Sequence, residues 1–462
     1  MIFEKDFIVF IYNNYLHIVD LRGKEKERDN CVKALKSISC DPSPFDFVNE
    51  IKKQSGIPQN IKNRFLTNAG IVLTDLCQLR CNYCSYDSGQ SIDSLSFNQA
   101  KMFIDYIYQN IVIKEYFGIP TNDNHIYFAG GGEPTAHWDL FVKTVDYIKK
   151  LNQSLKNKIK IYMTSNGFLN DSQLKYVIAN VDSTLVSFDG TEFLQNKNRK
   201  TSNLMSSYSI VDKTLREMNR QKYPFSIRST FWPDDLKSLR DAADFIFGNY
   251  GNINKWEFEV VAELGRACKS DVFNSSTDYS ALSVDFINYY EDLFNYISEK
   301  YPQKAFSNSV ANSKLKRFNC GTIYGKYIWL RANGEIVTCI DAHDDATILG
   351  YIKDKIEFYS FNDQLTEQYL KTIRTTCFDC LAQYYCGYGC PVRNKTFSVG
   401  SKWLCNSKKM FYKKAFNCIL ENHSYLNLFG EKTTIDALGE FDVYKVQIKK
   451  GEKNEKKQQS KD

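Results

Sequence analysis

The chain has 462 residues and a formal net charge of +6, and 43% of its residues are apolar and 15% aromatic. That apolar content is sufficient for a buried core, which excludes a wholly disordered chain and removes the need for disulfide staples. At about 150 residues per domain, the length suggests roughly three folding units.

The excess positive charge is small and unevenly placed. The last fourteen residues, 449–462, contain six lysines and three acidic residues, so half of the +6 lies in this tail, which we expect to be disordered. The rest of the chain is too weakly basic to predict a nucleic-acid partner. No apolar run reaches the ~18 residues of a membrane helix, and the N-terminus is unlike a signal peptide. We therefore expect a cytoplasmic protein without a membrane partner.

The first 66 residues are predicted to form a small α+β module. Two apolar runs around Asn13-Asn14 predict a β-hairpin over residues 7–21, because asparagine tolerates the positive φ of a two-residue turn. Helices are predicted near residues 28–39 and from Pro44 to Gly56, where proline suits the first helical turn and glycine ends the helix.

From residue 70, short β-rich runs alternate with amphipathic helices. Strands are predicted at 70–74, 125–130, 158–164, 183–187, 225–232 and 255–262. Helices are predicted after the capping box Ser96–Gln99 and near 138–153, 170–180, 208–220, 235–249 and 283–300. Six βα repeats imply parallel strands with right-handed crossovers, hence an α/β fold that is either a doubly wound sheet or a complete or partial barrel.

Residues 301–425 are rich in cysteine and poor in regular periodicity. One hairpin is clear, because apolar runs at 326–331 and 335–340 flank Ala332-Asn333-Gly334, and Asn-Gly is a strong turn signal. The remaining segment, 426–462, is predicted to be a C-terminal extension that ends in the basic tail.

Fourteen cysteines in a reducing compartment are more often metal ligands or catalytic groups than disulfides. Ten of them fall into two sets, Cys77/Cys81/Cys84 and Cys320/Cys339/Cys377/Cys380/Cys386/Cys390/Cys405. The other four, Cys31, Cys40, Cys268 and Cys418, lack ligand spacing and are predicted to be small core residues.

The first set lies in the loop that follows the first predicted strand. Three thiolates on one loop can hold three irons of a cubane cluster and leave the fourth iron without a protein ligand. Zinc is the rival metal, but a structural zinc site needs four ligands, and no fourth lies nearby.

This loop, with Tyr83 before the third cysteine, resembles the hallmark of the radical SAM enzymes. Phe128–Thr135, which contains Gly131-Gly132-Glu133, is similar to the family's Gly-Gly-Glu motif, which approaches the amino group of S-adenosylmethionine (SAM). Residues 263–267 resemble its Gly-Arg-Ala turn. The resemblance implies a partial (β/α)6 TIM barrel over residues 67–300. It also implies SAM contacts from Gly131, Gly132, Glu133, Ser165, Asn166, Ser187, Asp189 and Arg228.

The second cysteine set resembles the SPASM extension of radical SAM enzymes, which carries two auxiliary [4Fe-4S] clusters, so three clusters are implied in all. By that resemblance the outer auxiliary cluster takes Cys377, Cys380, Cys386 and Cys405, and the inner one takes Cys320, Cys339 and Cys390. The inner cluster then has either an open iron or a remote fourth ligand, for which Cys268, Cys418 and His343 are candidates. A zinc ribbon is the alternative for the two close pairs.

The resemblance implies an oxidoreductase that cleaves SAM to a 5′-deoxyadenosyl radical. The enzyme would receive its electrons from a reducing donor such as a flavodoxin or ferredoxin. As in SPASM relatives that are RiPP maturases, the expected substrate is a ribosomally made precursor peptide, cross-linked by thioether or carbon-carbon bonds. The N-terminal hairpin resembles part of a leader-peptide recognition element, although capping of the barrel is an equal alternative.

Two other functions stay open. One is an anaerobic sulfatase-maturating enzyme, which oxidises Cys or Ser to formylglycine; the other is a non-catalytic metal-binding scaffold. The sequence identifies no general base.

Overall fold

The computed structural model describes residues 2–12, 15–37, 66–119, 123–261, 265–269, 279–310, 327–341, 347–359, 377, 380–386, 390, 399–421, 428–433, 435, 438 and 441–448. The predicted helix from Pro44 to Gly56 and the basic tail lie outside these residues. None of the helices in these ranges is long and apolar enough to cross a membrane.

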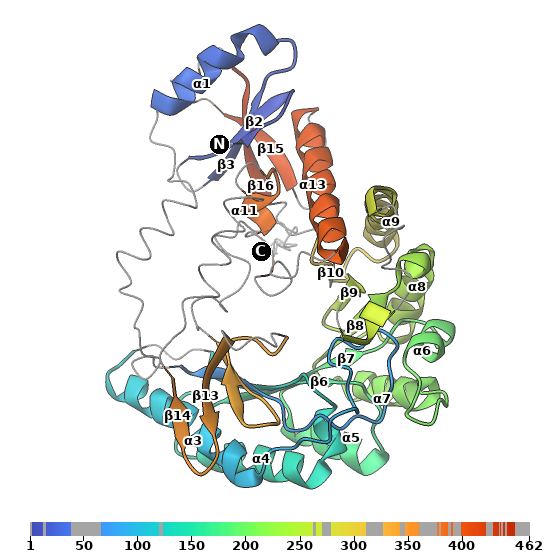
Figure 1. The fold of residues 1–462 in the computed structure, drawn as a ribbon. Coiled ribbons are helices and arrows are strands. Elements are labelled where there is room, and N and C mark those ends of the chain that lie inside the picture. The colour runs from blue at the N-terminus through green and yellow to red at the C-terminus, as the bar shows by residue number, and fades with distance from the viewer. Residues whose placement is uncertain are drawn as a thin grey trace, which may run out of the picture.

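A parallel sheet that curves into a partial barrel forms the lower part of the molecule in the view of Figure 1. Its strands follow one another in chain order, β4 (Asn68–Ile71), β5 (His125–Phe128), β6 (Lys160–Ser165), β7 (Ser183–Ser187), β8 (Phe225–Phe231), β9 (Trp256–Val260) and β10 (Phe306–Ser307). All six predicted strands are confirmed, and neighbouring strands pair in parallel, as expected.

Helices cover the outer face of this sheet. They are α3 (Phe97–Tyr116), α4 (Trp138–Leu151), α5 (Asp171–Asn180), α6 (Glu192–Asn198), α7 (Tyr208–Arg220), α8 (Leu239–Asn249) and α9 (Tyr279–Lys300), with 3-10 turns η3 (Pro134–Ala136), η4 (Pro233–Ser238) and η5 (Gly265–Lys269). The capping box at Ser96 is confirmed, since its side chain accepts from the Gln99 N–H and Gln99 reaches back to the Ser96 N–H. Among these helices, α6 was not predicted.

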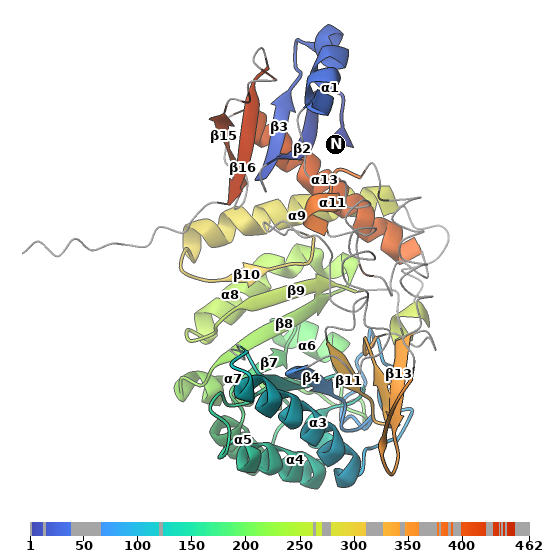
Figure 2. The same ribbon diagram turned by 90° about the vertical axis from the view of Figure 1, so that its left-hand side faces the viewer.

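The cysteine-rich region continues the same sheet at its other edge. The predicted hairpin is confirmed as β11 (Ile328–Leu330) and β12 (Glu335–Val337), and Gly334 turns between them with φ +89°. Strand β11 pairs in parallel with β4, and β13 (Ile348–Ile352) and β14 (Ile356–Phe358) follow β12. The two regions therefore share one backbone hydrogen-bond network (Figure 2).

A second sheet joins the two ends of the chain. The predicted N-terminal hairpin is confirmed as β2 (Phe7–Tyr12) and β3 (Tyr15–Asp20), preceded by β1 (Ile2–Phe3). Strand β3 pairs on its other side with β16 (Val443–Ile448), and β16 pairs with β15 (Leu428–Thr433). Helix α1 (Arg28–Ser37), which follows η1 (Glu25–Glu27), buries Cys31 and Leu35 against this sheet. The C-terminal extension thus shares a sheet with the N-terminal strands, which the sequence did not predict.

Helix α13 (Val399–Leu420) connects the second sheet to the barrel (Figure 1). Its Phe416 packs against Phe7 at 6.1 Å between ring centroids, and its Trp403 packs against Phe286 of α9 at 5.6 Å. The short helix α11 (Gln383–Cys386) lies beside it, where Tyr385 stacks on Tyr412. A helix of 22 residues therefore lies within the region that the sequence predicts to be poor in regular periodicity.

Candidate active site

A cavity of about 470 Å³ opens at the carboxyl ends of the parallel strands. Loops that follow successive parallel strands meet at this edge, where α/β active sites are usually built. The cavity is lined by ten of the eleven residues predicted for the first cluster and SAM, namely Cys77, Cys81, Cys84, Gly131, Gly132, Glu133, Ser165, Asn166, Ser187 and Arg228.

The three cysteines of the cavity are half-buried, and two of their thiols accept hydrogen bonds from backbone N–H groups. The Sγ of Cys77 accepts from the Leu79 N–H at 3.4 Å, and that of Cys84 accepts from the Ser88 N–H at 3.4 Å. Burial raises the pKa of Cys77 to about 12 and that of Cys81 to about 11. Thiols with such pKa values become thiolates at neutral pH only when a cation offsets the desolvation. This donor set therefore fits an iron-sulfur cluster.

A single metal ion fits these thiols less well. Within the described ranges, no three His, Cys, Asp or Glu side chains are arranged to hold one ion. A cubane cluster takes one thiolate on each iron, so its ligands surround it at wider spacing.

The backbone of the cysteine loop is held by two arginines. Arg80 Nη1 donates to the carbonyl of Cys77 at 2.7 Å. Arg266 donates to the carbonyls of Cys81, at 2.5 Å, and Ser88, at 3.1 Å, and to the carboxylate of Asp87. Arg266 comes from η5, after the last long barrel strand, so the turn that resembles Gly-Arg-Ala fastens the cysteine loop to the far side of the barrel.

Gly265 and Gly132 allow other segments to touch the cysteine loop. Gly265 has φ +56°, and a Cβ there would lie 2.6 Å from the carbonyl carbon of Ser85. A Cβ on Gly132 would lie 2.6 Å from the carbonyl carbons of Asp75 and Leu76. The sequence predicted that Gly132 lets the backbone approach a ligand. The structure shows a second role, because Gly132 also packs directly against the backbone that leads into Cys77.

Glu133 is buried, with 3% of its surface exposed, and both carboxylate oxygens accept hydrogen bonds. Oε1 accepts from the Ser165 hydroxyl at 2.9 Å and the Thr135 hydroxyl at 2.8 Å, and Oε2 accepts from the Asn166 N–H at 2.6 Å. Burial raises the pKa of Glu133, and these hydrogen bonds oppose that rise. The loops after β5 and β6 therefore meet at this carboxylate, which is fixed in orientation at the cavity wall.

Asp189 is the predicted SAM contact that does not line the cavity. It is fully buried, and it accepts hydrogen bonds from the Tyr83 hydroxyl, from Arg199 Nε at 3.0 Å and from the Thr230 N–H at 3.0 Å. Arg199 lies over the Tyr83 ring at 5.2 Å. Asp189 thus holds Arg199 and Tyr83, which are themselves part of the cavity wall.

Several other residues that line the cavity were not predicted from the sequence. Trp329 of β11 covers Gly70, where a Cβ would collide with its ring, and it packs against Tyr127 at 6.1 Å. The Tyr86 hydroxyl donates to Asp341 at 2.6 Å, and this carboxylate is two residues beyond Cys339. Glu259 accepts from the Ser309 hydroxyl at 2.6 Å. No motif marks these residues, but the alternation along β9 and β11 could have assigned Glu259 and Trp329 to the barrel interior.

Four cysteines of the second set lie close together. The pKa of Cys377 is raised to about 12, first by burial and then by the nearby thiols of Cys380, Cys405 and Cys386. The pKa of Cys405 is raised to about 11, first by burial and then by the thiols of Cys386 and Cys380. These are the four residues predicted for the outer cluster.

The other cysteines are more dispersed. Cys339 lies near Tyr86 at the cavity, Cys390 is half-buried, and Cys320, His343 and Cys40 lie outside the described residues. Cys31 is buried, as predicted, but Cys268 is exposed, so its assignment to the core was wrong; it lies in η5, the same 3-10 turn as Arg266. Cys418 is half-buried, and its charged neighbours are Glu421, Glu291 and Lys414.

Comparison with known proteins agrees with this site. Residues 71–246 match the Radical SAM superfamily model. The barrel is therefore a radical SAM domain and the chain is an enzyme, which removes the non-catalytic scaffold. A radical SAM domain implies a [4Fe-4S] cluster and SAM.

Related proteins extend beyond that domain. A cysteine-type anaerobic sulfatase-maturating enzyme of Clostridium perfringens is 22% identical over 363 residues, which cover 74% of this chain and 93% of that protein. The solved structure of histidine-tagged anSMEcpe with bound AdoMet has a TM-score of 0.58 at 18% identity and covers 77% of this chain and 94% of its own. Native anSMEcpe with bound AdoMet and Cp18Cys peptide has a TM-score of 0.57 at 18% identity, with coverage of 77% and 98%. These structures share the fold of this chain.

Proposed function

We propose that this enzyme is a peptide maturase that cross-links residues of a ribosomally made precursor peptide and carries two auxiliary clusters on its C-terminal cysteines. The observation that supports it most is one cavity that contains the three cysteines of the first set and all but one of the residues predicted to contact SAM. The gathering of Cys377, Cys380, Cys386 and Cys405 in a second place supports an outer auxiliary cluster.

In this proposal Cys77, Cys81 and Cys84 hold the first cluster, and Glu133 accepts from the SAM ammonium. When bound, the cluster and SAM supply a 5′-deoxyadenosyl radical that removes hydrogen from a substrate carbon. Trp329 and Tyr127 form an apolar wall that keeps water from that carbon.

Thioether formation also needs a proton acceptor. A hydrogen atom leaves carbon, a proton leaves the substrate thiol, and one electron passes to an acceptor, for which an auxiliary cluster is our proposal. Asp341 presents a carboxylate in the cavity and is held by Tyr86 at 2.6 Å. We assign it as the candidate acceptor for the proton, because it stands beside the region of Cys339.

Peptide recognition is proposed for the N-terminal sheet. A peptide can add as a strand to a free sheet edge. Because β16 covers the edge of β3, the edges left in the described part of this sheet are β1 and β15. The proposal thus moves peptide capture from the hairpin edge to an outer strand, and barrel capping stays the competing role.

Formylglycine formation is the second candidate, favoured by the similarity to sulfatase-maturating enzymes along most of their length. The two functions differ in the fate of sulfur. Both reactions remove two hydrogens. Cross-linking by thioether keeps the sulfur, whereas formylglycine formation also replaces the sulfur by oxygen.

One experiment separates them. Anaerobically reconstituted enzyme is incubated with SAM, dithionite and two Cys-containing peptides, one encoded beside the gene and one from a sulfatase, and the products are analysed by mass spectrometry. Loss of two hydrogens from the neighbouring peptide, with its sulfur retained, supports the proposal. Loss of two hydrogens together with exchange of sulfur for oxygen in the sulfatase peptide supports the second candidate. Iron analysis tests the clusters, since three cubanes require about twelve irons.

A further inference from the structure

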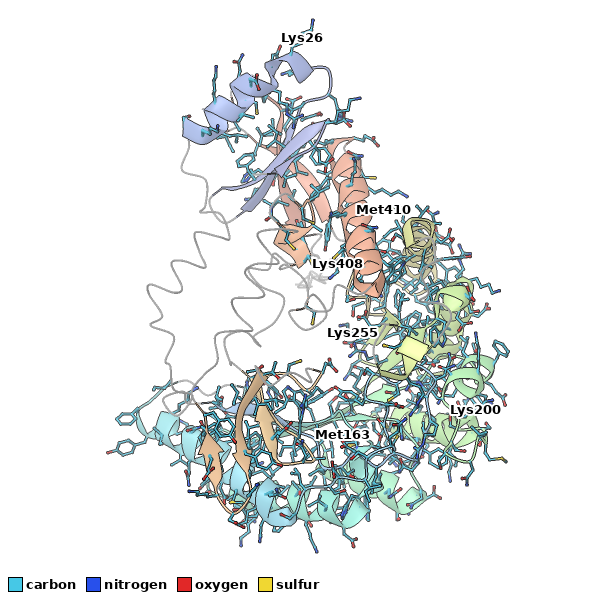
Figure 3. All side chains as sticks on the ribbon, in the orientation of Figure 1. Lys26, Met163, Lys200, Lys255, Lys408 and Met410 are labelled. Carbon is cyan, nitrogen blue, oxygen red and sulfur yellow. The ribbon has the colours of Figure 1, made fainter. Side chains whose placement is uncertain are left out.

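Helix α13 brings a buried lysine to the second cysteine group. Cys405 and Lys408 are three residues apart on this helix, so they lie on the same face one turn from each other. Lys408 is 7% exposed, and its Nζ donates to the Sγ of Cys386 at 3.5 Å. Figure 3 labels Lys408 on α13. The side chain therefore touches a predicted ligand from α11 while its backbone lies beside another.

A buried ammonium is costly unless an anion faces it. A cubane with four thiolate ligands carries net negative charge and becomes more negative when it is reduced. Since Coulomb interactions are strong where water is excluded, an ammonium in contact with a ligand sulfur stabilises the reduced form more than the oxidised form. Hydrogen bonds to the sulfurs act in the same direction on the potential.

The next residue provides a natural control. Lys409 is exposed, and it also acts electrostatically on the thiols of Cys377, Cys380 and Cys405. Because its charge is in solvent, water and salt screen its effect. Two adjacent lysines thus differ in burial and in contact with sulfur.

We infer that Lys408 raises the reduction potential of the outer auxiliary cluster and so favours that cluster as an electron acceptor. This inference depends on the proposed cluster on Cys377, Cys380, Cys386 and Cys405. It makes Lys408 a tuning residue that acts through the cluster and does not touch the substrate.

The test is a redox titration of the full-length reconstituted protein, followed by electron paramagnetic resonance. Each variant is made in the Cys77→Ala/Cys81→Ala/Cys84→Ala background, which removes the SAM cluster signal. Lys408→Met should lower the reduction potential of the outer cluster by at least about 59 mV, which for one electron is a tenfold change in the equilibrium constant of reduction. Lys409→Met should shift it much less, and the shift should fade as salt is added. Lys408→Arg should keep the potential near that of the parent.

Lys408→Gln keeps a hydrogen-bond donor without the charge, and it replaces Lys408→Met if that variant does not assemble its clusters. Equal potentials for the parent, Lys408→Gln and Lys409→Met, at equal iron content, overturn the inference. If the parent itself binds no iron at the C-terminal cysteines, the proposed auxiliary cluster fails first. Iron content therefore distinguishes failure of the proposed function from failure of the role of Lys408.

Discussion

Replacing Gly132 by Ala tests whether the cavity depends on tight packing of backbone against backbone. The new Cβ would lie 2.6 Å from the carbonyl carbons of Asp75 and Leu76, and closer still to the Leu76 oxygen. Gly132 is not among the glycines with positive φ, so the cost is steric. Overpacking costs about 1–3 kcal/mol, and because a peptide group cannot rotate away as a side chain can, we expect the upper end of that range.

The matched control is Gly248→Ala, near the end of α8. A Cβ at Gly248 meets nothing within 4 Å, and its φ is also outside the positive region. Alanine there should stabilise the helix by about 0.5–1 kcal/mol. Anaerobic urea unfolding and iron analysis measure both variants. Loss of stability together with loss of iron from the first cluster is expected only for Gly132→Ala; unchanged stability and full iron in this variant would refute the packing argument.

Three further predictions concern the same site. Replacing Cys77, Cys81 and Cys84 together by Ala should abolish 5′-deoxyadenosine formation, measured by chromatography, while the proposed C-terminal clusters persist, because separate segments would supply their thiolates. Arg266→Lys loses the forked contacts to the cysteine loop, each worth about 1.5–3 kcal/mol. A chelator should therefore remove iron from the first cluster faster in this variant than in the parent enzyme, and equal rates would contradict a role of Arg266 in holding the loop. Glu133→Gln replaces one carboxylate oxygen by an amide NH2 group, which would face the Ser165 hydroxyl or the Asn166 N–H, both of which are donors. This variant should bind SAM more weakly, as measured by calorimetry. Because burial raises the pKa of Glu133, SAM affinity should fall on acidification at a higher pH than for an exposed glutamate, and a pH-independent affinity would contradict this.

The barrel and most of its cavity could be predicted because both depend on local sequence. Strands such as Phe225–Phe231 are short and rich in aromatic and β-branched residues, and they alternate with amphipathic helices. Parallel topology then places every loop after a strand at one edge, so polar residues in those loops must converge. Asp189 shows the limit of this reasoning, because its position after β7 is correct while its carboxylate binds Tyr83 and Arg199 instead of lining the cavity.

The missed elements depend on contacts between distant segments. Strand β16 pairs with β3 although the two lie near opposite ends of the chain, and no local pattern records which edge a strand will join. Helix α13 was overlooked because it is buried on several sides, against α9, the second sheet and the cysteine group. Its apolar residues therefore do not form the single stripe of a surface helix.

The pairing of β11 with β4 has a consequence for the two predicted cluster regions. Val72 donates to the carbonyl of Leu330 at 2.8 Å, so the strand that leads to Cys77 and the hairpin that leads to Cys339 are joined by ladder hydrogen bonds. Tyr86 and Asp341 join the same two segments again on the far side of the cysteines, through a hydrogen bond of 2.6 Å. Because both segments are fixed twice, their separation is set by sheet geometry and not by a flexible linker. In the proposed cross-linking reaction, a substrate held between these two segments would meet the first cysteine loop and Cys339 in one rigid frame, which would favour reaction at one carbon and one sulfur.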